Sequence, residues 1–326
     1  MSSPIFHSII DTTIEEYLAH QRALGRGYAL EERVLDSLVE FLTQAHAADL
    51  DQSHFEGWRN LHLKLTANVR RSRQRIVRNF CLYRRRTEPD CFVPNLDSFP
   101  RPQPYCTPVL VEPEQIGRML TLASQLTPTP GSPLRPAVLR LAIVLLYTAG
   151  LRRGELLRLT LQDVEPRAGV LRIRESKFHK SRLVPVSPDA LAELHHYLRQ
   201  RLTPTFDAQP VSPLLCNFAR GRLRPYTGTG LSEGIYCLFD AADVHGRDGR
   251  HPRIHDLRHS FAIQALIRWY REGVDVQSRL PHLALYMGHV SIVSTAYYLR
   301  WTPSLATLAS DRFELRFGHL LQGGRP

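Results

Sequence analysis

Hydrophobic residues in the first part of the chain recur at helical spacing. They lie three or four residues apart in two groups, which are Ile14, Tyr17 and Leu18, and then Val34, Leu35, Leu38 and Leu42. This period is typical of amphipathic helices with one buried face. The pattern predicts helices from residue 10 to about 86, the last two over 53–65 and 67–86.

The second half shows a similar pattern, with one interruption. Helices are predicted over 112–126, over 136–149 up to Gly150, over 187–202, and through most of the chain from residue 228 onward. Two short apolar runs, 169–174 and 182–186, flank a basic turn and predict an antiparallel pair of strands. The predicted fold class is therefore mainly α, with a small antiparallel β-hairpin or sheet.

Prolines divide the chain. Seven of them fall between residues 89 and 113, where they remove hydrogen-bond donors and favour an extended, semi-rigid linker. We therefore expect a helical domain over 1–88, a proline-rich linker over 89–110 and a second domain over 111–326.

Charge indicates a polyanionic partner. The chain has 42 Lys and Arg against 31 Asp and Glu, a formal net charge of +11, and positive charge favours binding to phosphates. The predicted helix 67–86 carries eight arginines and no acidic residue. A solvated basic face is the alternative, but we predict DNA contacts by Arg70, Arg71, Arg73, Arg75 and Arg78.

Cysteines and apolar runs indicate the compartment in which the protein resides. The five cysteines form no C-x-x-C pair and are odd in number, so neither a disulfide framework nor a thiolate zinc site is indicated. The N-terminus lacks the features of a secretory signal. The longest apolar run, 141–147, is far shorter than the ~20 residues of a membrane span. We expect a cytoplasmic protein without membrane contact.

Candidate chemistry lies in four segments that follow one another along the second domain. They are Thr148-Ala-Gly-Leu-Arg-Arg-Gly-Glu-Leu156, Ser176-Lys-Phe-His-Lys-Ser-Arg-Leu-Val-Pro185, His255-Asp-Leu-Arg-His259 and Met287-Gly-His289, the last followed by Tyr298. Each is weak alone. The three-residue step from His255 to Arg258, for example, only places both on one helix face.

Together and in this order, the four segments resemble the tyrosine recombinase, or phage integrase, family over about residues 105–313. The resemblance implies catalytic roles for Arg152, Lys177, His255, Arg258, His289 and the nucleophile Tyr298, with Glu155 orienting an arginine. It also implies a helical N-terminal DNA-clamping domain of the SAM-like type. Neither metal, ATP nor any other cofactor is implied.

The chain departs from the family pattern in the lysine segment and beside the tyrosine. Ser176 and Phe178 stand where glycines often flank the lysine, and Gly154 stands where many members have Ser. The choice between Lys177 and Lys180 as general acid stays open, and Lys180 is otherwise expected to contact DNA. Tyr297 beside Tyr298 is a second ambiguity.

The residue types suit attack on a phosphodiester. Two guanidiniums can grip the non-bridging oxygens, which gives Arg152 and Arg258 the role of stabilising a pentavalent transition state. A phenol with a pKa near ~10 is a weak nucleophile at neutral pH, so Tyr298 needs a cationic pocket or a base such as His255. A lysine on the turn would protonate the leaving 5′-oxygen. The resemblance implies a 3′-phosphotyrosyl link.

The expected partners are double-stranded recombination sites, a homotetramer formed on two duplexes through a docking helix near 302–318, and accessory recombination proteins. The expected setting is a bacterial nucleoid. Three alternatives remain open, namely a type IB topoisomerase, a non-catalytic DNA-binding protein of the same fold, and a zinc hydrolase that uses His251, His255, His259 and His289. The zinc alternative lacks an H-E-x-x-H motif and a carboxylate ligand.

Overall fold

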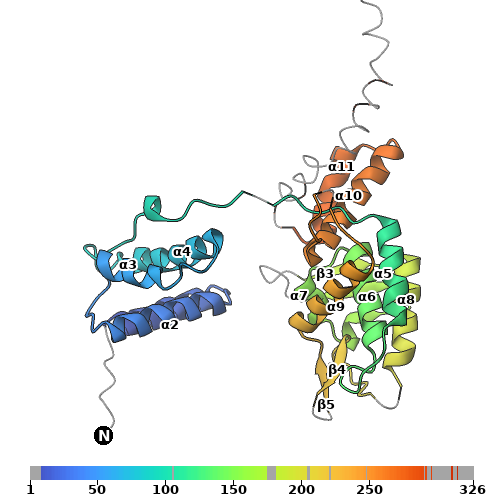
Figure 1. The fold of residues 1–326 in the computed structure, drawn as a ribbon, viewed down its shortest axis with the longest axis horizontal. Helices are drawn as coiled ribbons and strands as arrows, with labels where there is room; N and C mark the ends of the chain where they lie inside the picture. Colours follow the sequence, from blue (N-terminus) through green and yellow to red (C-terminus); the bar gives the residue numbers. More distant parts are fainter. Residues whose placement is uncertain are drawn as a thin grey trace, which may run out of the picture. The chain divides into compact units, whose positions relative to one another are not determined.

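The structure is a computed structural model, and it describes residues 9–104, 106–174, 181–203, 206–219, 222–246 and 248–289, with the single residues 291, 295, 310 and 314. The chain divides into two compact units, Met1–Cys106 and Thr107–Pro326 (Figure 1). Among the described residues, no helix is both long enough and apolar enough to cross a bilayer.

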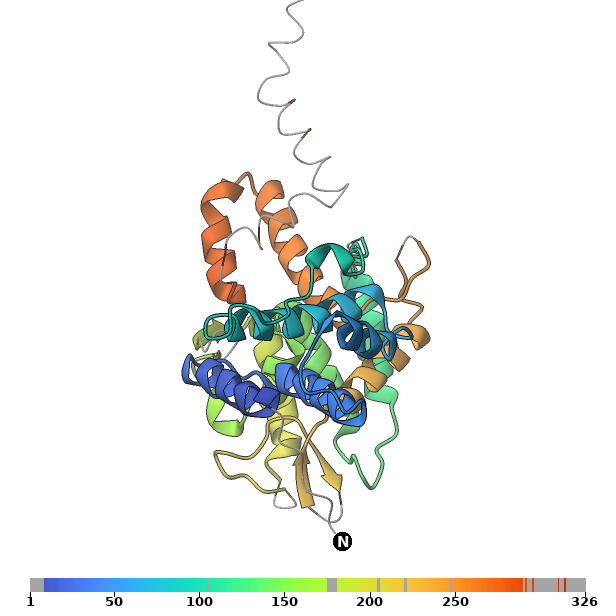
Figure 2. The same ribbon diagram turned by 90° about the vertical axis from the view of Figure 1, so that its left-hand side faces the viewer.

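The N-terminal unit is a small helical bundle, coloured blue to teal in Figure 2. Its helices are α1 (Ile9–Ala23), α2 (Ala29–Gln44), α3 (Gln52–Asn60) and α4 (Ala67–Arg84), followed by a 3-10 turn, η1 (Leu96–Ser98). Their apolar faces meet around Phe55, Trp58 and Phe80, all fully buried. The helix predicted over 53–65 is shorter than expected, because Leu61 and Leu63 face solvent in turns after Asn60.

The proline-rich linker is bound at both ends. On the first unit, Phe99 packs into the helical core, and Arg71 and Arg78 donate to the carbonyls of Pro100 (3.0 Å) and Pro94 (2.6 Å). In the second unit, Val109 and Val111 donate their backbone N–H groups to side chains of α10. The linker therefore makes fixed contacts over most of its length, which a proline count cannot show.

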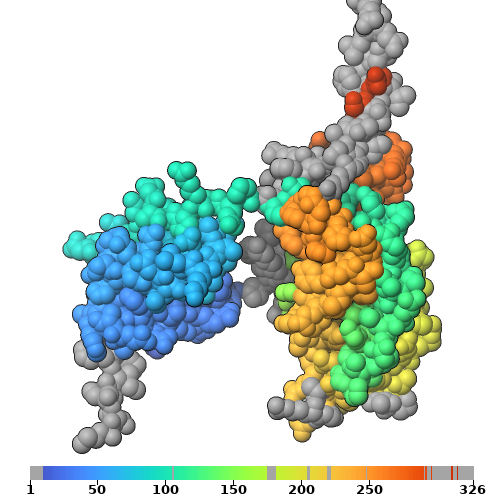
Figure 3. Space-filling view, viewed as in Figure 1, coloured from blue at the N-terminus to red at the C-terminus, as the bar shows by residue number. Residues whose placement is uncertain are grey.

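The second unit is built around α6, which is buried along most of its length and contacts several other helices. Its helices are α5 (Pro113–Gln125), α6 (Arg135–Thr148), α7 (Arg153–Arg158), α8 (Pro188–Arg201), α9 (Gly228–Ala241), α10 (Ile254–Arg271) and α11 (Val276–Met287), with a 3-10 turn, η2 (Leu161–Asp163). Figure 3 shows α5, in green, beside the orange run of α9 and α10, and α5 contacts α9 directly.

Two small antiparallel sheets complete this unit. The first has the order β1 (Val164–Glu165), β2 (Val170–Ile173) and β3 (Arg182–Pro185), and the second pairs β4 (Cys216–Ala219) with β5 (Arg222–Pro225). The register of the first pairs Ile173 with Arg182, which places Arg182 at the base of the β2–β3 turn. The mainly α fold is confirmed, but β4 and β5 were not predicted. Each is only four residues long, and β5 is largely exposed, so neither has a clear apolar period.

Candidate active site

Helix α10 places Arg258 in the interior of the second unit. Asp256 caps the helix by accepting from the backbone N–H of Arg253 (3.0 Å). One turn later Arg258 is almost completely buried, and its guanidinium donates to the carbonyls of Gly150 and Met287, the latter at 2.6 Å. A buried guanidinium requires such acceptors. His255, three residues earlier, remains exposed on the same helix.

The turn before α7 places Arg152 beside Arg258. Gly150 adopts a left-handed conformation (φ +58°), and a Cβ atom there would lie 2.5 Å from the ring of Phe261. Glycine therefore lets this turn approach α10 closely. Arg152 is the N-cap residue of α7, and it donates Nη2 to the carbonyl of Gly288 (2.9 Å) and Nη1 to Glu155 (2.7 Å).

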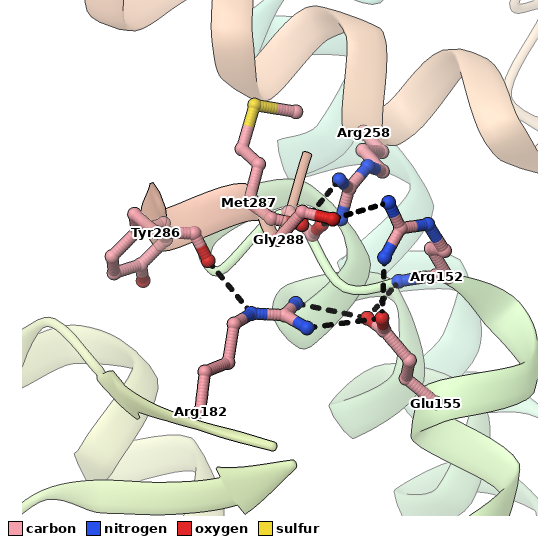
Figure 4. Close-up of polar contacts among 8 residues, drawn as sticks. Arg152, Glu155, Arg182, Arg258, Tyr286, Met287 and Gly288 are labelled. Atoms are coloured by element: carbon pink, nitrogen blue, oxygen red, sulfur yellow. Dashed lines mark hydrogen bonds and ion pairs between the residues drawn. The ribbon is translucent and has the colours of Figure 1, made fainter. Parts of the chain in front are cut away.

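Three consecutive carbonyls at the end of α11 each accept from a different arginine (Figure 4). Tyr286 accepts from Nε of Arg182 (2.8 Å), Met287 from Nη2 of Arg258 (2.6 Å) and Gly288 from Nη2 of Arg152 (2.9 Å). The last carbonyls of a helix lack intrahelical partners and carry partial negative charge, so cations are favoured there. The end of α11 thus holds three guanidiniums side by side. Arg182 was not predicted, although it belongs to the R-L-V-P part of the lysine segment.

Glu155 joins two of these arginines. Its buried carboxylate accepts from Arg152 and from both terminal nitrogens of Arg182, at 3.0 Å each. Burial alone would raise its pKa, but the hydrogen bonds from Arg182 and Arg152 outweigh burial and lower the pKa to about 2. Glu155 is therefore ionised at neutral pH and holds Arg152 in place.

The site histidines are neutral imidazoles at neutral pH. Burial, with the positive charges of Arg258 and Arg152, lowers the pKa of His289 to about 4. Burial also lowers the pKa of His259 to about 4, and partial desolvation of the ring, with the charge of Arg258, lowers the pKa of His255. Nδ1 of His289 lies 2.7 Å from the hydroxyl of Thr295. A neutral imidazole can accept a proton, which an imidazolium cannot.

Not every predicted site residue falls in the described part of the chain. Lys177, Lys180, Tyr298 and the segment 302–318, apart from residues 310 and 314, lie outside the described residues. Of the arginines predicted to contact DNA, Arg75 is exposed and Arg70 and Arg73 are partly exposed. Arg71 and Arg78 hold the linker, as described above.

Comparison with known proteins identifies the family of this chain. The model of the phage integrase family matches residues 111–304 of the chain, which is more than half of its length. The chain belongs to this family of tyrosine recombinases. It is 30% identical to the putative integrase/recombinase y4rE of Sinorhizobium fredii over 94% of this chain and 96% of that one. It is 33% identical to y4rB of the same organism, over 93% and 96%.

Among solved structures, the Tn1549 transposon integrase in complex with transposon right-end DNA is similar in fold. Its TM-score is 0.62 at 16% identity, and the match covers 93% of this chain and 98% of that one. The prediction of a tyrosine recombinase, an enzyme that breaks and rejoins DNA, is confirmed. Within the described ranges, no group of three or more His, Cys, Asp or Glu residues is arranged to hold a metal ion.

Proposed function

We propose that this recombinase cuts a specific DNA site with Tyr298 and rejoins the strands through a 3′-phosphotyrosyl link. The observation that carries the proposal is the pair of guanidiniums of Arg152 and Arg258, which hydrogen-bond adjacent carbonyls at residues 287 and 288. A guanidinium held in this way needs little rearrangement when charge develops on a phosphate.

The roles of the two arginines follow from their contacts. Each uses part of its guanidinium on backbone carbonyls, and Arg152 uses a further nitrogen on Glu155. A guanidinium has five N–H donors in a fixed fork, and the contacts of Arg152 with Glu155 and Gly288 leave it donors for the non-bridging oxygens of a phosphodiester. These two residues would bind the phosphate and stabilise the pentavalent transition state.

The histidines and the lysine would carry out the proton transfers. His289 follows directly on the turn that holds the arginines, and its low pKa keeps it a neutral imidazole, whose ring N–H would donate to a phosphate oxygen. His255 would accept the proton of the Tyr298 phenol. Lys177, or Lys180 in its place, would protonate the leaving 5′-oxygen.

Assembly on DNA is the remaining part of the proposal. We propose that four protomers act on two duplexes, with the segment near 302–318 docking on a neighbouring protomer. The relatives are called integrases or recombinases, and the Tn1549 integrase was solved with transposon DNA. Movement of a DNA element between sites is therefore the activity that we propose, rather than relaxation of supercoils.

Paired tyrosine substitutions test the nucleophile. Tyr298→Phe should bind DNA normally and form no covalent adduct, because only the attacking oxygen is lost. Tyr297→Phe is the matched control and should form the adduct. The covalent adduct between protein and DNA is measured by denaturing electrophoresis, with a labelled duplex that carries one end of the mobile DNA element. An adduct that persists in Tyr298→Phe and disappears in Tyr297→Phe would move the nucleophile by one residue. A strand-exchange assay between two sites then separates recombinase from topoisomerase.

A further inference from the structure

Arg182 occupies an unusual position between the sheet and the arginine pair. It starts β3, opposite Ile173 of β2, and its side chain is 10% exposed. Both of its terminal nitrogens contact Glu155, and Nε donates to the carbonyl of Tyr286 (Figure 4). One side chain thus joins β3, α7 and the end of α11.

The backbone at the end of α11 is shaped around this side chain. Gly288 has a left-handed conformation (φ +66°), and a Cβ atom there would lie 2.8 Å from Nη1 of Arg182. Any other residue would therefore be strained and would also collide with the guanidinium. The carbonyl of the same Gly288 holds Arg152. The glycine and Arg182 therefore fit each other at the place where Arg152 is held.

The charges in this cluster do not balance. Two guanidiniums, of Arg152 and Arg182, share the carboxylate of Glu155, and a third, of Arg258, donates to the adjacent carbonyl of Met287. The neighbouring His259 and His289 are neutral at pH 7 because their pKa values are about 4. The side chains of Arg152, Arg182, Arg258 and Glu155 together therefore carry a net charge of two positive units, here called the excess. Without Arg182, the carboxylate would be left to Arg152, and the excess would fall to one.

We propose that Arg182 is a positioning residue for DNA cleavage, which acts by neutralising Glu155 so that Arg152 keeps its full charge for the phosphate. This assignment rests on the proposed function. The phosphodiester carries one negative charge and its pentavalent transition state carries more, so the cluster's excess charge matters most in the transition state. Arg182 itself contacts Glu155 and the peptide backbone.

Charge compensation provides the test. Arg182→Met should slow single-turnover formation of the covalent adduct by about 10²-fold, with affinity for DNA nearly unchanged. The double variant Glu155→Gln/Arg182→Met removes the carboxylate as well and restores the excess of two charges, so it should recover part of the lost rate. A purely structural role predicts the opposite, because the double variant loses a second partner in the same network. A double variant as slow as Arg182→Met, or slower, overturns the assignment.

Further variants separate charge from fold. Arg182→Lys keeps the charge and loses the fork, so it should stay within about tenfold of the wild type. A rate as low as that of Arg182→Met would contradict a charge role. Arg172→Met is the matched control, since Arg172 pairs with Glu165 (2.6 Å) on the exposed side of the same sheet and should be dispensable.

The leaving group supplies the last arm of the test. A duplex with sulfur in place of the bridging 5′-oxygen has a leaving group that needs no protonation. If Arg182 acts through Arg152, the defect of Arg182→Met persists on this substrate. If the defect disappears, Arg182 acts instead through the lysine that protonates the leaving group. A wild-type protein that forms no adduct on any duplex would instead contradict the proposed function.

Discussion

The two units of the chain both gather arginines, but they hold them differently. In the N-terminal unit, α4 presents Arg75 to solvent, while Arg84 is buried between Asp49 and Glu88. In the second unit, the guanidiniums of Arg152, Arg182 and Arg258 all donate hydrogen bonds to backbone carbonyls of one turn. An exposed arginine acts mainly through its charge, whereas one held by several acceptors acts through its position. The same residue type is therefore expected to bind DNA loosely in one unit and to orient a phosphate in the other.

The largest effect is expected where position matters most. Arg258→Lys keeps the charge, but a lysine cannot span the carbonyls of Gly150 and Met287 with a rigid fork. We expect adduct formation to fall by about 10³-fold, with DNA affinity within a few-fold of the wild type by anisotropy. Arg268→Lys, on an exposed position of the same helix, is the control. A small loss of rate would show that charge alone is sufficient at this position.

Acid should weaken the second unit through groups that have low pKa values in the fold. Glu155 has a pKa of about 2 in the folded protein, below its ordinary value, so its contribution to stability is present above pH ~4.5 and is lost as pH falls towards 2. His259, with a pKa of about 4, is neutral in the fold and charges more readily when unfolded, so its contribution is lost between pH ~6.5 and 4.

Each group contributes up to about 3 kcal/mol by this linkage. Urea unfolding followed by the near-ultraviolet signal should therefore show stability falling from pH 6.5 downward. His259→Gln should make the upper part of the curve less steep, with the remaining slope due to His289, whose pKa is also about 4, and should leave the lower part unchanged. A stability that is constant between pH 6.5 and 4 would contradict the low pKa of this histidine.

Salt dependence distinguishes arginines within α4. Arg75→Ala should reduce the slope of log affinity against log salt by about one, as expected for one lost phosphate contact. Arg78 already donates to the carbonyl of Pro94, so Arg78→Ala should change the slope less. Equal changes in both variants would mean that Arg78 leaves the linker when DNA binds.

The smallest effect is expected from the linker itself. Arg71→Ala removes the donor to the carbonyl of Pro100 and should cost about 1 kcal/mol locally. Amide hydrogen exchange at Gln103, whose backbone N–H donates to Asn68, should then become several-fold faster than in the wild type, while the melting temperature hardly changes. Unaltered exchange would show that Phe99 alone is enough to hold this part of the linker.

Sequence periodicity predicted the long helices well. Helices were expected over 112–126 and 136–149, and α5 and α6 span Pro113–Gln125 and Arg135–Thr148. Their apolar faces are long enough to give a clear helical period. The β4–β5 hairpin was missed because its strands are short and one of them is exposed.

The site could be predicted only in part. The motifs singled out Arg152, Arg258 and His289, and the structure brings these residues to the end of α11, although their catalytic roles stay predictions. Nothing in the sequence indicated that Arg182 would share Glu155 with Arg152. That contact joins two elements through tertiary packing, and neither helical nor strand periodicity carries information about it. Similarly, an arginine-rich helix does not show which arginines hold a linker.

The contacts at both ends of the linker set how far the two units can separate. The chain is held up to Gln103 on one side and from Val109 on the other, and the stretch from Gln103 to Val109 can span at most about 22 Å. If both units bind DNA, as we predict, so short a tether gives each unit an effective concentration of about a millimolar near the other. Once one unit has bound a duplex, binding of the other becomes nearly intramolecular. Weak contacts by α4 could thus hold the recombinase on DNA for as long as the slower chemistry requires.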